Sequence, residues 1–204
     1  MRLSAPLSPA FYTRPATAVA RDLLGMRLVR CLDGRRLSGI ILETEAYQGE
    51  EDLACHARAG RTPRTAVMYG PPGRAYVYFT YGMHWLLNCV VEPEGTPAAV
   101  LLRAIFPLEG REEILARRAG QPARACCDGP AKLTLALGID GGQNGVDLCS
   151  PAEGLWIEAG PALPDAWVQT GPRVGIHRVP EPWRSIPWRF LARPPDGWAP
   201  PGVG

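Results

Sequence analysis

Hydrophobic and polar residues alternate along several short segments of this chain, and turns rich in Gly and Pro separate these segments. In the aromatic run RAYVYFTY, at residues 74–81, every second side chain would lie on the same face of a strand. Asp33 and Gly34 separate two apolar runs and predict a tight hairpin turn. The predicted strands are residues 26–32, 37–45, 74–81, 84–91, 98–105, 155–158 and 174–176.

Helices are predicted on either side of these strands. Pro15 begins one helix, which Gly25 ends after residue 24, and residues 108–118 and 130–137 predict two others. Because helices and strands do not alternate regularly, we expect one mixed α/β domain with a curved, mostly antiparallel sheet flanked by helices. The domain should span residues 1–194, and the Pro- and Gly-rich residues 195–204 should form a disordered tail.

The composition is that of a globular protein, with 46% hydrophobic and 21% charged residues among 204. No apolar run has transmembrane length and no signal peptide is recognised, so a cytoplasmic protein is expected. The six cysteines include no C-x-x-C pair, which argues against a disulfide framework and a zinc site. Lys132 is the only lysine, so amine chemistry is restricted to Lys132 and the N-terminus.

Two glutamates stand two residues apart at the end of a predicted strand. Glu43 and Glu45 should share a face, and a carboxylate that leaves the core beside Tyr47 is suited to act as a desolvated general base. Arg103 ends the apolar run AAVLLRA, where an arginine requires a carboxylate partner, namely Glu45 or Glu43. The alternatives are an exposed strand-end glutamate and a purely structural ion pair.

Aromatic residues cluster around these carboxylates in the sequence. Several tyrosine rings beside a carboxylate predict a slot for a flat ring, because nucleobases are recognised by stacking on aromatic faces. Packing inside the core is the alternative, and it is the expected role of Tyr76. The set comprises Tyr47, Tyr69, Tyr76, Tyr78 and Tyr81, followed by Trp85.

Basic residues recur in the loop HARAGRTPR. Arg58, Arg61 and Arg64 are spaced by three residues and predict contacts with phosphates, with a solvated loop as the alternative. Lys132 follows Gly129 and Pro130 at the start of a predicted helix and also suits a phosphate. His56 has no second His or Cys at metal-ligand spacing, so we expect no metal.

Five fragments together resemble the alkyladenine (3-methyladenine) DNA glycosylase family, over about residues 7–190. They are ETEAY with a histidine nine residues after its tyrosine, YVYFTYGMHWLLN, VLLRAIFP, GPAKLTLALGI and RVGI, in the family's order. The resemblance implies a monofunctional glycosylase without a cofactor. It would act as a monomer on damaged double-stranded DNA and remove purines of the 3-methyladenine, hypoxanthine and ethenoadenine class in base excision repair.

The resemblance also implies roles for single residues. Glu45 matches the catalytic acid that activates water, and Arg103 and the backbone carbonyl of Val174 match the groups that hold this water. Tyr81 matches the residue that is wedged into the duplex, with Met83 beside it. The walls of the flipped-base pocket match Tyr47, His56 and Tyr78.

Asn88 matches the family residue that crowds the exocyclic 2-amino group of guanine. It is a polar residue in the otherwise apolar run WLLNCVV, so its amide needs a partner. The alternative to this gate is an amide satisfied by neighbouring backbone.

Two other functions are compatible with parts of the pattern. A glycosylase with lyase activity would need an amine nucleophile, for which Lys132 is the available lysine. A module that binds damaged DNA without cutting it would not need both Glu45 and Arg103. Trapping of a protein–DNA adduct with borohydride distinguishes the first function, and release of free base excludes the second.

Overall fold

The protein is described by a computed structural model that covers residues 4–122, 125–195, 197–198 and 200. Its strands are β1 (Arg27–Leu32), β2 (Arg35–Gln48), β3 (Ala75–Thr80), β4 (His84–Val90), β5 (Ala98–Glu109), β6 (Leu155–Glu158), β7 (Val168–Gly171) and β8 (Arg189–Ala192). Its α-helices are α1 (Pro9–Tyr12), α2 (Ala16–Asp22), α3 (Arg111–Arg117) and α4 (Pro130–Leu137). Short 3-10 helices are η1 (His56–Ala59), η2 (Ala66–Tyr69), η4 (Gly141–Gln143) and η5 (Asp165–Trp167).

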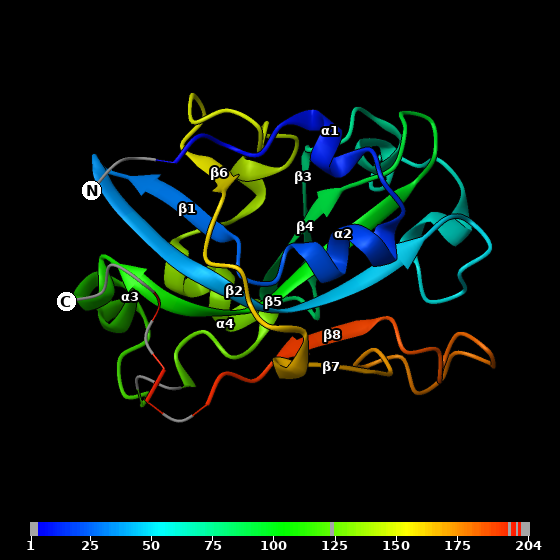
Figure 1. Cartoon of the computed structure of the whole chain (residues 1–204). Coiled ribbons are helices and arrows are strands. Elements are labelled where there is room, and N and C mark those ends of the chain that lie inside the picture. Colours follow the sequence, from blue (N-terminus) through cyan, green and yellow to red (C-terminus); the bar gives the residue numbers. More distant parts are fainter. Residues whose placement is uncertain (1–3, 123–124, 196, 199, 201–204) are drawn as a thin grey trace.

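The strands form one curved sheet in the order β3-β4-β5-β2-β1-β6, and β8 joins β7 to β2 (Figure 1). All the strand pairs described are antiparallel. This arrangement confirms the predicted mixed α/β domain with a mostly antiparallel sheet. The long strands β2 and β5 cross the middle of the molecule, and the β3–β4 hairpin extends from β5.

The strand β2 positions the acidic pair. On one edge its first half pairs with β1 and its residues 43–45 pair with β8, while the other edge pairs with β5. Register shifts against β5 occur around Glu43, and such irregularities bend a strand locally. Glu43 and Glu45 therefore lie on a central strand that is hydrogen-bonded on both edges.

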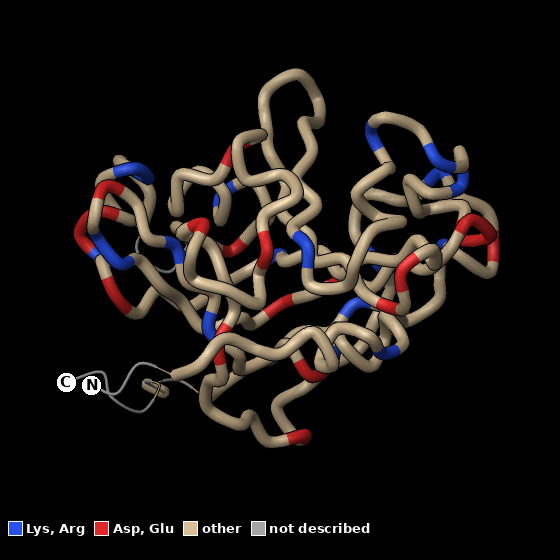
Figure 2. Tube along the Cα trace, turned by 90° about the horizontal axis from the view of Figure 1, so that it is seen from above, with Lys and Arg blue, Asp and Glu red and all other residues tan. Residues whose placement is uncertain are grey.

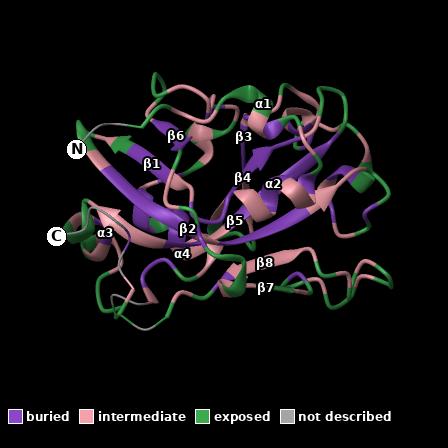
Figure 3. Cartoon of the chain, viewed as in Figure 1, coloured by how far each residue is buried: buried purple, intermediate pink, exposed green. Residues whose placement is uncertain are grey.

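The helices pack on this sheet and enclose the core. The helix α2 packs against β2 and β5, whereas α4 packs against β4, β5 and α3. Apolar side chains of α2 and α4 belong to one buried cluster with those of the strands. Figure 3 shows that most of β2 is buried. A second, smaller cluster beneath the β3–β4 hairpin includes Cys55, Met68, Tyr76 and Val90. This smaller cluster lies next to the cavity described below.

Most of the predicted elements are present in the structure. The helix at residues 130–137 and the strand at residues 155–158 have the predicted bounds. Asp33 and Gly34 both have positive φ angles, of 50° and 75°, and connect paired Leu32 and Arg35, which confirms the hairpin turn. The helix expected at residues 108–118 begins only at Arg111, because residues up to 109 continue β5 and Glu109 accepts hydrogen bonds from Arg36 and Ser38 of β2.

One predicted strand is wrong. Residues 174–176 form bends and irregular backbone, and the strands of this part of the chain are β7 and β8 on either side of them. The Val174 amide bonds to the side chain of Glu45, which explains why this segment does not form a ladder with another strand. Within the predicted tail, Trp198 packs edge-on against Phe106 and Trp167, while residues 196, 199 and 201–204 lie outside the described residues.

Candidate active site

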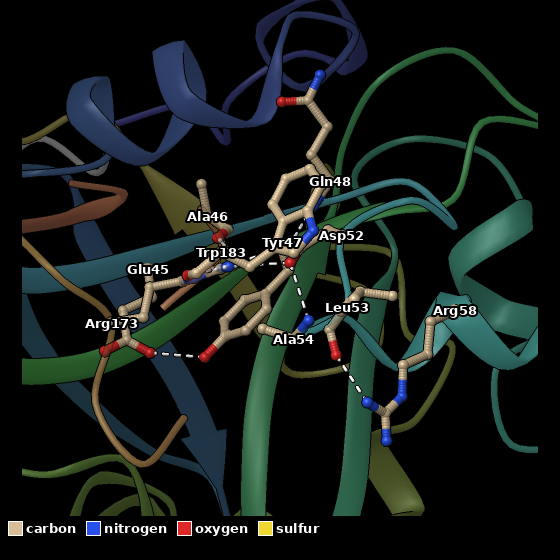
Figure 4. Close-up of polar contacts among 10 residues, drawn as sticks. All are labelled: Glu45, Ala46, Tyr47, Gln48, Asp52, Leu53, Ala54, Arg58, Arg173 and Trp183. Carbon is tan, nitrogen blue, oxygen red and sulfur yellow. Dashed lines mark hydrogen bonds and ion pairs between the residues drawn. The ribbon is translucent and has the colours of Figure 1, made fainter. Parts of the chain in front are cut away.

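Glu45 is fully buried and its carboxylate is held by three groups. Its Oε1 accepts a hydrogen bond from the Val174 amide at 2.7 Å and lies 3.3 Å from the Arg103 Nε. Its Oε2 accepts a hydrogen bond from the Tyr47 hydroxyl at 2.8 Å (Figure 4). The structure thus brings together Glu45, Arg103 and Val174, which the resemblance places around a water, and adds Tyr47, which the resemblance places in the pocket wall. In the structure the Val174 N–H bonds to Glu45, whereas the resemblance implied that the Val174 carbonyl holds a water.

Glu43 shares a face with Glu45, as expected from their spacing, and also contacts Arg103. The Arg103 Nε donates a hydrogen bond to Glu43 Oε1 at 2.7 Å, which is shorter than its 3.3 Å distance to Glu45. Arg189 of β8 donates a second hydrogen bond to the same Glu43 oxygen at 2.6 Å. Glu43 is therefore flanked by two guanidinium groups, while Glu45 shares one of them.

This arrangement sets the protonation of Glu45. Burial raises the pKa of Glu45 above its ordinary value, and the charge of Arg103 lowers this pKa, as do the bonds from Val174 and Tyr47. The net direction is upward, and the negative charge of Glu43 adds to it. A carboxylate with a raised pKa is a better proton acceptor than an ordinary glutamate, which suits a general base.

A cavity of about 360 Å³ lies above this carboxylate. Tyr47, Arg103 and Val174, which contact Glu45, all line the cavity, although Glu45 itself has no exposed surface. Of the other residues predicted for the site, those that line the cavity are His56, Tyr78, Tyr81 and Asn88. The predicted catalytic and base-pocket residues therefore converge from β2, β3, β4, β5 and the segment after β7.

One wall of the cavity consists of aromatic rings held to one another. The His56 ring meets the Tyr78 ring edge-on, with the centroids 4.5 Å apart, and His56 Nδ1 is 2.9 Å from the Tyr76 hydroxyl. Burial lowers the pKa of His56 to about 4, and the charges of Arg64 and Arg58 add to this effect. His56 is therefore neutral near pH 7 and offers a neutral imidazole.

Tyr76 was expected to be a core residue, and the structure shows that it is both buried and part of the cavity wall. Its side chain is 2% exposed, lines the cavity and pairs with His56. Its position two residues before Tyr78 on β3 was the signal for this role, since both rings lie on the same strand face.

Tyr81 and Met83 lie at the tip of the β3–β4 hairpin and are 82% and 67% exposed. The turn is closed by a hydrogen bond from the Met83 amide to the Thr80 carbonyl at 3.2 Å. Tyr81 and Gly82 both have positive φ angles, of 52° and 67°, which is unfavourable for a tyrosine. A large ring held in an unfavourable backbone conformation and pointing away from the core is consistent with a role in binding.

Asn88 on β4 is buried, and its Nδ2 donates a hydrogen bond to the Tyr76 carbonyl at 3.0 Å. Asn88 also lines the cavity. The backbone thus satisfies the amide, as the alternative expected, and the gate stays a prediction.

The basic residues predicted to contact phosphates are not among the described residues that line the cavity. Arg58, Arg61 and Arg64 are exposed in and after η1, and Figure 2 shows positive positions gathered in a loop at the upper right of the view. Arg58 donates a hydrogen bond to the Leu53 carbonyl, and Arg61 lies over the Tyr69 ring. Lys132, in the first turn of α4, pairs with Asp128 at 2.6 Å.

An ion pair that was not predicted from the sequence supports the floor of the cavity. Arg173 and Asp52 are fully buried side chains that pair with each other, and Arg173 Nη2 lies 2.9 Å from Asp52 Oδ1 (Figure 4). Arg173 also donates to the Ala46 carbonyl at 2.9 Å, and its guanidinium lies 4.7 Å from the centre of the Tyr47 ring. These contacts hold Arg173, which directly precedes Val174, against the end of β2 and against Asp52 in the loop after it.

Within the described part of the chain, no group of three or more His, Cys, Asp or Glu residues could hold a metal ion. No helix among the described residues is long and apolar enough to cross a membrane.

The chain is similar to known proteins over almost its whole length. Residues 10–195 match the methylpurine-DNA glycosylase (MPG) family. A relative from Burkholderia lata is 48% identical over 93% of this chain and 92% of its own length, and one from Methanocella arvoryzae is 48% identical over 88% of each chain. A relative from Myxococcus xanthus is 46% identical over 92% of this chain and 90% of its own. All three carry the provisional name 3-methyladenine DNA glycosylase.

The family match and the buried carboxylate beneath an aromatic cavity agree with the resemblance found in the sequence. The chain therefore belongs to the methylpurine-DNA glycosylase family and is a DNA glycosylase, a hydrolase of N-glycosidic bonds.

Proposed function

We propose that this protein is a monofunctional glycosylase that flips damaged purines out of duplex DNA and hydrolyses their glycosidic bonds with a water activated by Glu45. The substrates would be purines of the 3-methyladenine, hypoxanthine and ethenoadenine class. The observation that carries the proposal is the buried Glu45 carboxylate, with Arg103, Tyr47 and the Val174 amide fixed around it at the floor of an aromatic cavity.

The chemistry follows from this placement. Breaking the glycosidic bond develops positive charge on the sugar, and a fixed carboxylate stabilises that charge and accepts a proton from the attacking water. Arg103 and the Val174 amide orient Glu45 Oε1. Because Glu45 has no exposed surface, the water has to enter between Tyr47, Arg103 and Val174 at the floor.

The cavity supports base flipping. A base that is stacked in a duplex cannot reach a carboxylate at the floor of a pocket, so it has to leave the helix, at a cost of a few kcal/mol. Inside the cavity, a purine would stack between Tyr47 and the wall formed by His56 and Tyr78. Tyr81 at the exposed hairpin tip would fill the gap left in the stack, with Met83 beside it.

Several features support the remaining parts of the proposal. Arg58 and Lys132 each follow a cavity-lining residue by two positions, and Arg64 lies over the ring of Tyr78 in the cavity wall. Together with Arg61 of the same loop, they would contact the DNA backbone. The enzyme would act as a monomer without a cofactor, and a DNA substrate favours a cytoplasmic location. The exposed Lys132 amine pairs with Asp128 and does not line the cavity, so lyase chemistry through this lysine has no support.

The test is a panel of duplexes that each contain one lesion. We expect free 3-methyladenine, hypoxanthine and ethenoadenine to be released, leaving an intact strand with an abasic site. Borohydride should trap no protein–DNA adduct. Strand cleavage with adduct formation would indicate a lyase, and tight lesion binding without base release would indicate a binding module.

A further inference from the structure

The two tyrosine walls of the cavity are each backed by an arginine that does not itself line the cavity. Arg173 lies 4.7 Å from the centre of the Tyr47 ring, and Arg64 lies 5.3 Å from the centre of the Tyr78 ring. Both tyrosines line the cavity, and both guanidinium groups are absent from the described residues that do so. A purine stacked between the walls would therefore have a guanidinium behind each ring.

The two arginines differ in how their charge is balanced. Arg173 is buried and forms an ion pair with the carboxylate of Asp52, which neutralises it. Arg64 is exposed, and among the described residues no carboxylate pairs with it. The Tyr47 wall is thus backed by a neutral pair, whereas the Tyr78 wall is backed by a net positive charge. The lowered pKa of His56, to which Arg64 contributes, is consistent with a positive potential at this wall.

A positive potential at this wall acts differently on positively charged and on neutral damaged purines. An N-alkylated purine nucleoside such as 7-methylguanine carries a positive charge, while hypoxanthine is neutral. When water attacks the sugar carbon and Glu45 takes its proton, the electron pair of the breaking bond moves to the base nitrogen. The alkylated base then leaves as a neutral molecule, whereas the neutral base leaves with developing negative charge. Because each base gains one negative charge as it leaves, a nearby cation assists the departure step of both alike. The two bases differ on entry into the cavity, where the cation repels the positively charged base and not the neutral one.

We propose that Arg64 is a specificity-determining residue that lowers the efficiency of release, counted from the base stacked in DNA, for positively charged purines relative to neutral purines. This inference rests on the proposed function and deepens it. It assigns Arg64 an effect on the base, in addition to the predicted contact with a phosphate.

The loop offers a matched control. Arg61 belongs to the same basic loop and lies over the ring of Tyr69, which is not among the described residues that line the cavity. Arg61→Gln and Arg64→Gln each remove one positive charge next to the DNA. Only Arg64→Gln removes it from behind a cavity wall, and Arg64→Lys keeps the charge there.

The experiment measures single-turnover rates on two duplexes that differ only in the lesion, 7-methylguanine or hypoxanthine. Enzyme is in excess over DNA but below saturation, so that the rate includes binding and entry of the base into the cavity. For each variant the quantity of interest is the ratio of the 7-methylguanine rate to the hypoxanthine rate, since it cancels changes in DNA binding that affect both duplexes equally. With an exposed charge on the order of 10 Å from the base, Coulomb's law predicts that Arg64→Gln raises this ratio roughly two- to fivefold. Arg64→Lys and Arg61→Gln should keep the ratio of the unchanged protein.

A ratio in Arg64→Gln equal to that of the unchanged protein would overturn the proposal and leave Arg64 as a phosphate contact. A rise of the same size in both variants would also overturn it, because the effect would then come from the charge of the loop as a whole. Failure of the unchanged protein to release either base would instead contradict the proposed function. Circular dichroism of each variant checks that this exposed loop substitution leaves the fold intact.

Discussion

Glu45 at the cavity floor and Tyr81 at the hairpin tip lie at the two ends of the site and differ in almost every physical respect. Glu45 is 0% exposed, and three groups from β2, β5 and the segment after β7 hold its carboxylate. Tyr81 is 82% exposed and lies in a turn in which Tyr81 and Gly82 have positive φ angles. The comparison suggests that the floor depends on the packing of the whole domain, while the tip depends on the DNA for its contacts. Substitutions at the two ends should therefore separate chemistry and stability from binding.

The largest expected effect is on the chemistry of the floor. Glu45→Gln keeps the shape of the side chain but removes the base and its charge, so single-turnover base release should fall about 1,000-fold or more. Affinity for a lesion duplex, measured by fluorescence anisotropy, should remain largely unchanged. Glu43→Gln is the matched control and should be milder, because Glu43 acts on the site only through Arg103 and has Arg189 as a second partner. An inactive Glu43→Gln together with an active Glu45→Gln would reverse the assignment.

The stability of the floor should depend on the buried ion pair beneath it. Asp52→Asn leaves the fully buried Arg173 without its counter-charge, so the free energy of unfolding should fall by about 3–5 kcal/mol. Urea unfolding followed by circular dichroism measures this loss. Tyr81→Ala is the reference at the other end of the site and should change the free energy of unfolding by less than about 0.5 kcal/mol. Equal losses in the two variants would remove the contrast between floor and tip.

Binding should be the property that depends on the tip. Tyr81→Ala should weaken affinity for a lesion duplex roughly ten- to hundredfold, because stacking on a base contributes about 1–3 kcal/mol. Tyr81→Phe keeps the ring and should bind like the unchanged protein. A large fall in melting temperature with unchanged lesion affinity would show instead that Tyr81 supports the fold.

A smaller effect is expected at the wall between the two ends. Asn88→Ala opens space in the cavity and should raise release of guanine-type lesions relative to hypoxanthine, since the amide no longer crowds the 2-amino group. It also leaves the buried Tyr76 carbonyl without the bond from Nδ2, at a cost of about 1 kcal/mol of stability or somewhat more. Asn88→Ser is a second variant with a smaller loss of polarity. An unchanged release ratio in a folded variant would leave Asn88 as a structural amide.

The smallest expected effect is a shift in pH dependence at the floor. The active form of Glu45 is ionised, so base release should fall as the pH drops through its raised pKa, which lies above the ordinary value of 4.5. The Tyr47 bond lowers this pKa, so Tyr47→Phe should move the acid limb to higher pH. Rates on 7-methylguanine show this limb cleanly, because a base that is already cationic needs no proton to leave. A limb at the same pH in Tyr47→Phe would show that the bond does not influence the ionisation of Glu45.

Local patterns were sufficient to predict much of the fold. The Asp33–Gly34 turn and the bounds of α4 and β6 follow from residues within a few positions, which is why they agree with the structure. The strands β7 and β8 were not predicted, because each has four residues and is stabilised by pairing with a distant strand. The segment at 174–176 carried an apolar pattern but bonds to a side chain.

The candidate site could likewise be predicted only in part from local patterns. The spacing of Glu43 and Glu45 predicted a shared face, and the order of the family motifs directed attention to Arg103 and Val174. Arg173 stands beside Val174 within RVGI, yet its partner Asp52 is 121 residues away, and no local pattern predicts such a pair. A sequence can indicate which residue types belong to a site, but long-range contacts decide which charges compensate each other.

The position of Glu45 on β2 also has a consequence for how the protein is synthesised. The contacts of the acidic pair join residues separated by 60 positions for Arg103 and Glu43, 129 for Val174 and Glu45, and 146 for Arg189 and Glu43. Contacts of such high sequence separation form late, because closure of long loops has to precede them. A nascent chain that still lacks residues 174–189 would carry Glu45 on β2 without the amide that orients it and without Arg189. Catalytic competence should therefore arise only when residues 174–189 have left the ribosome and docked on β2.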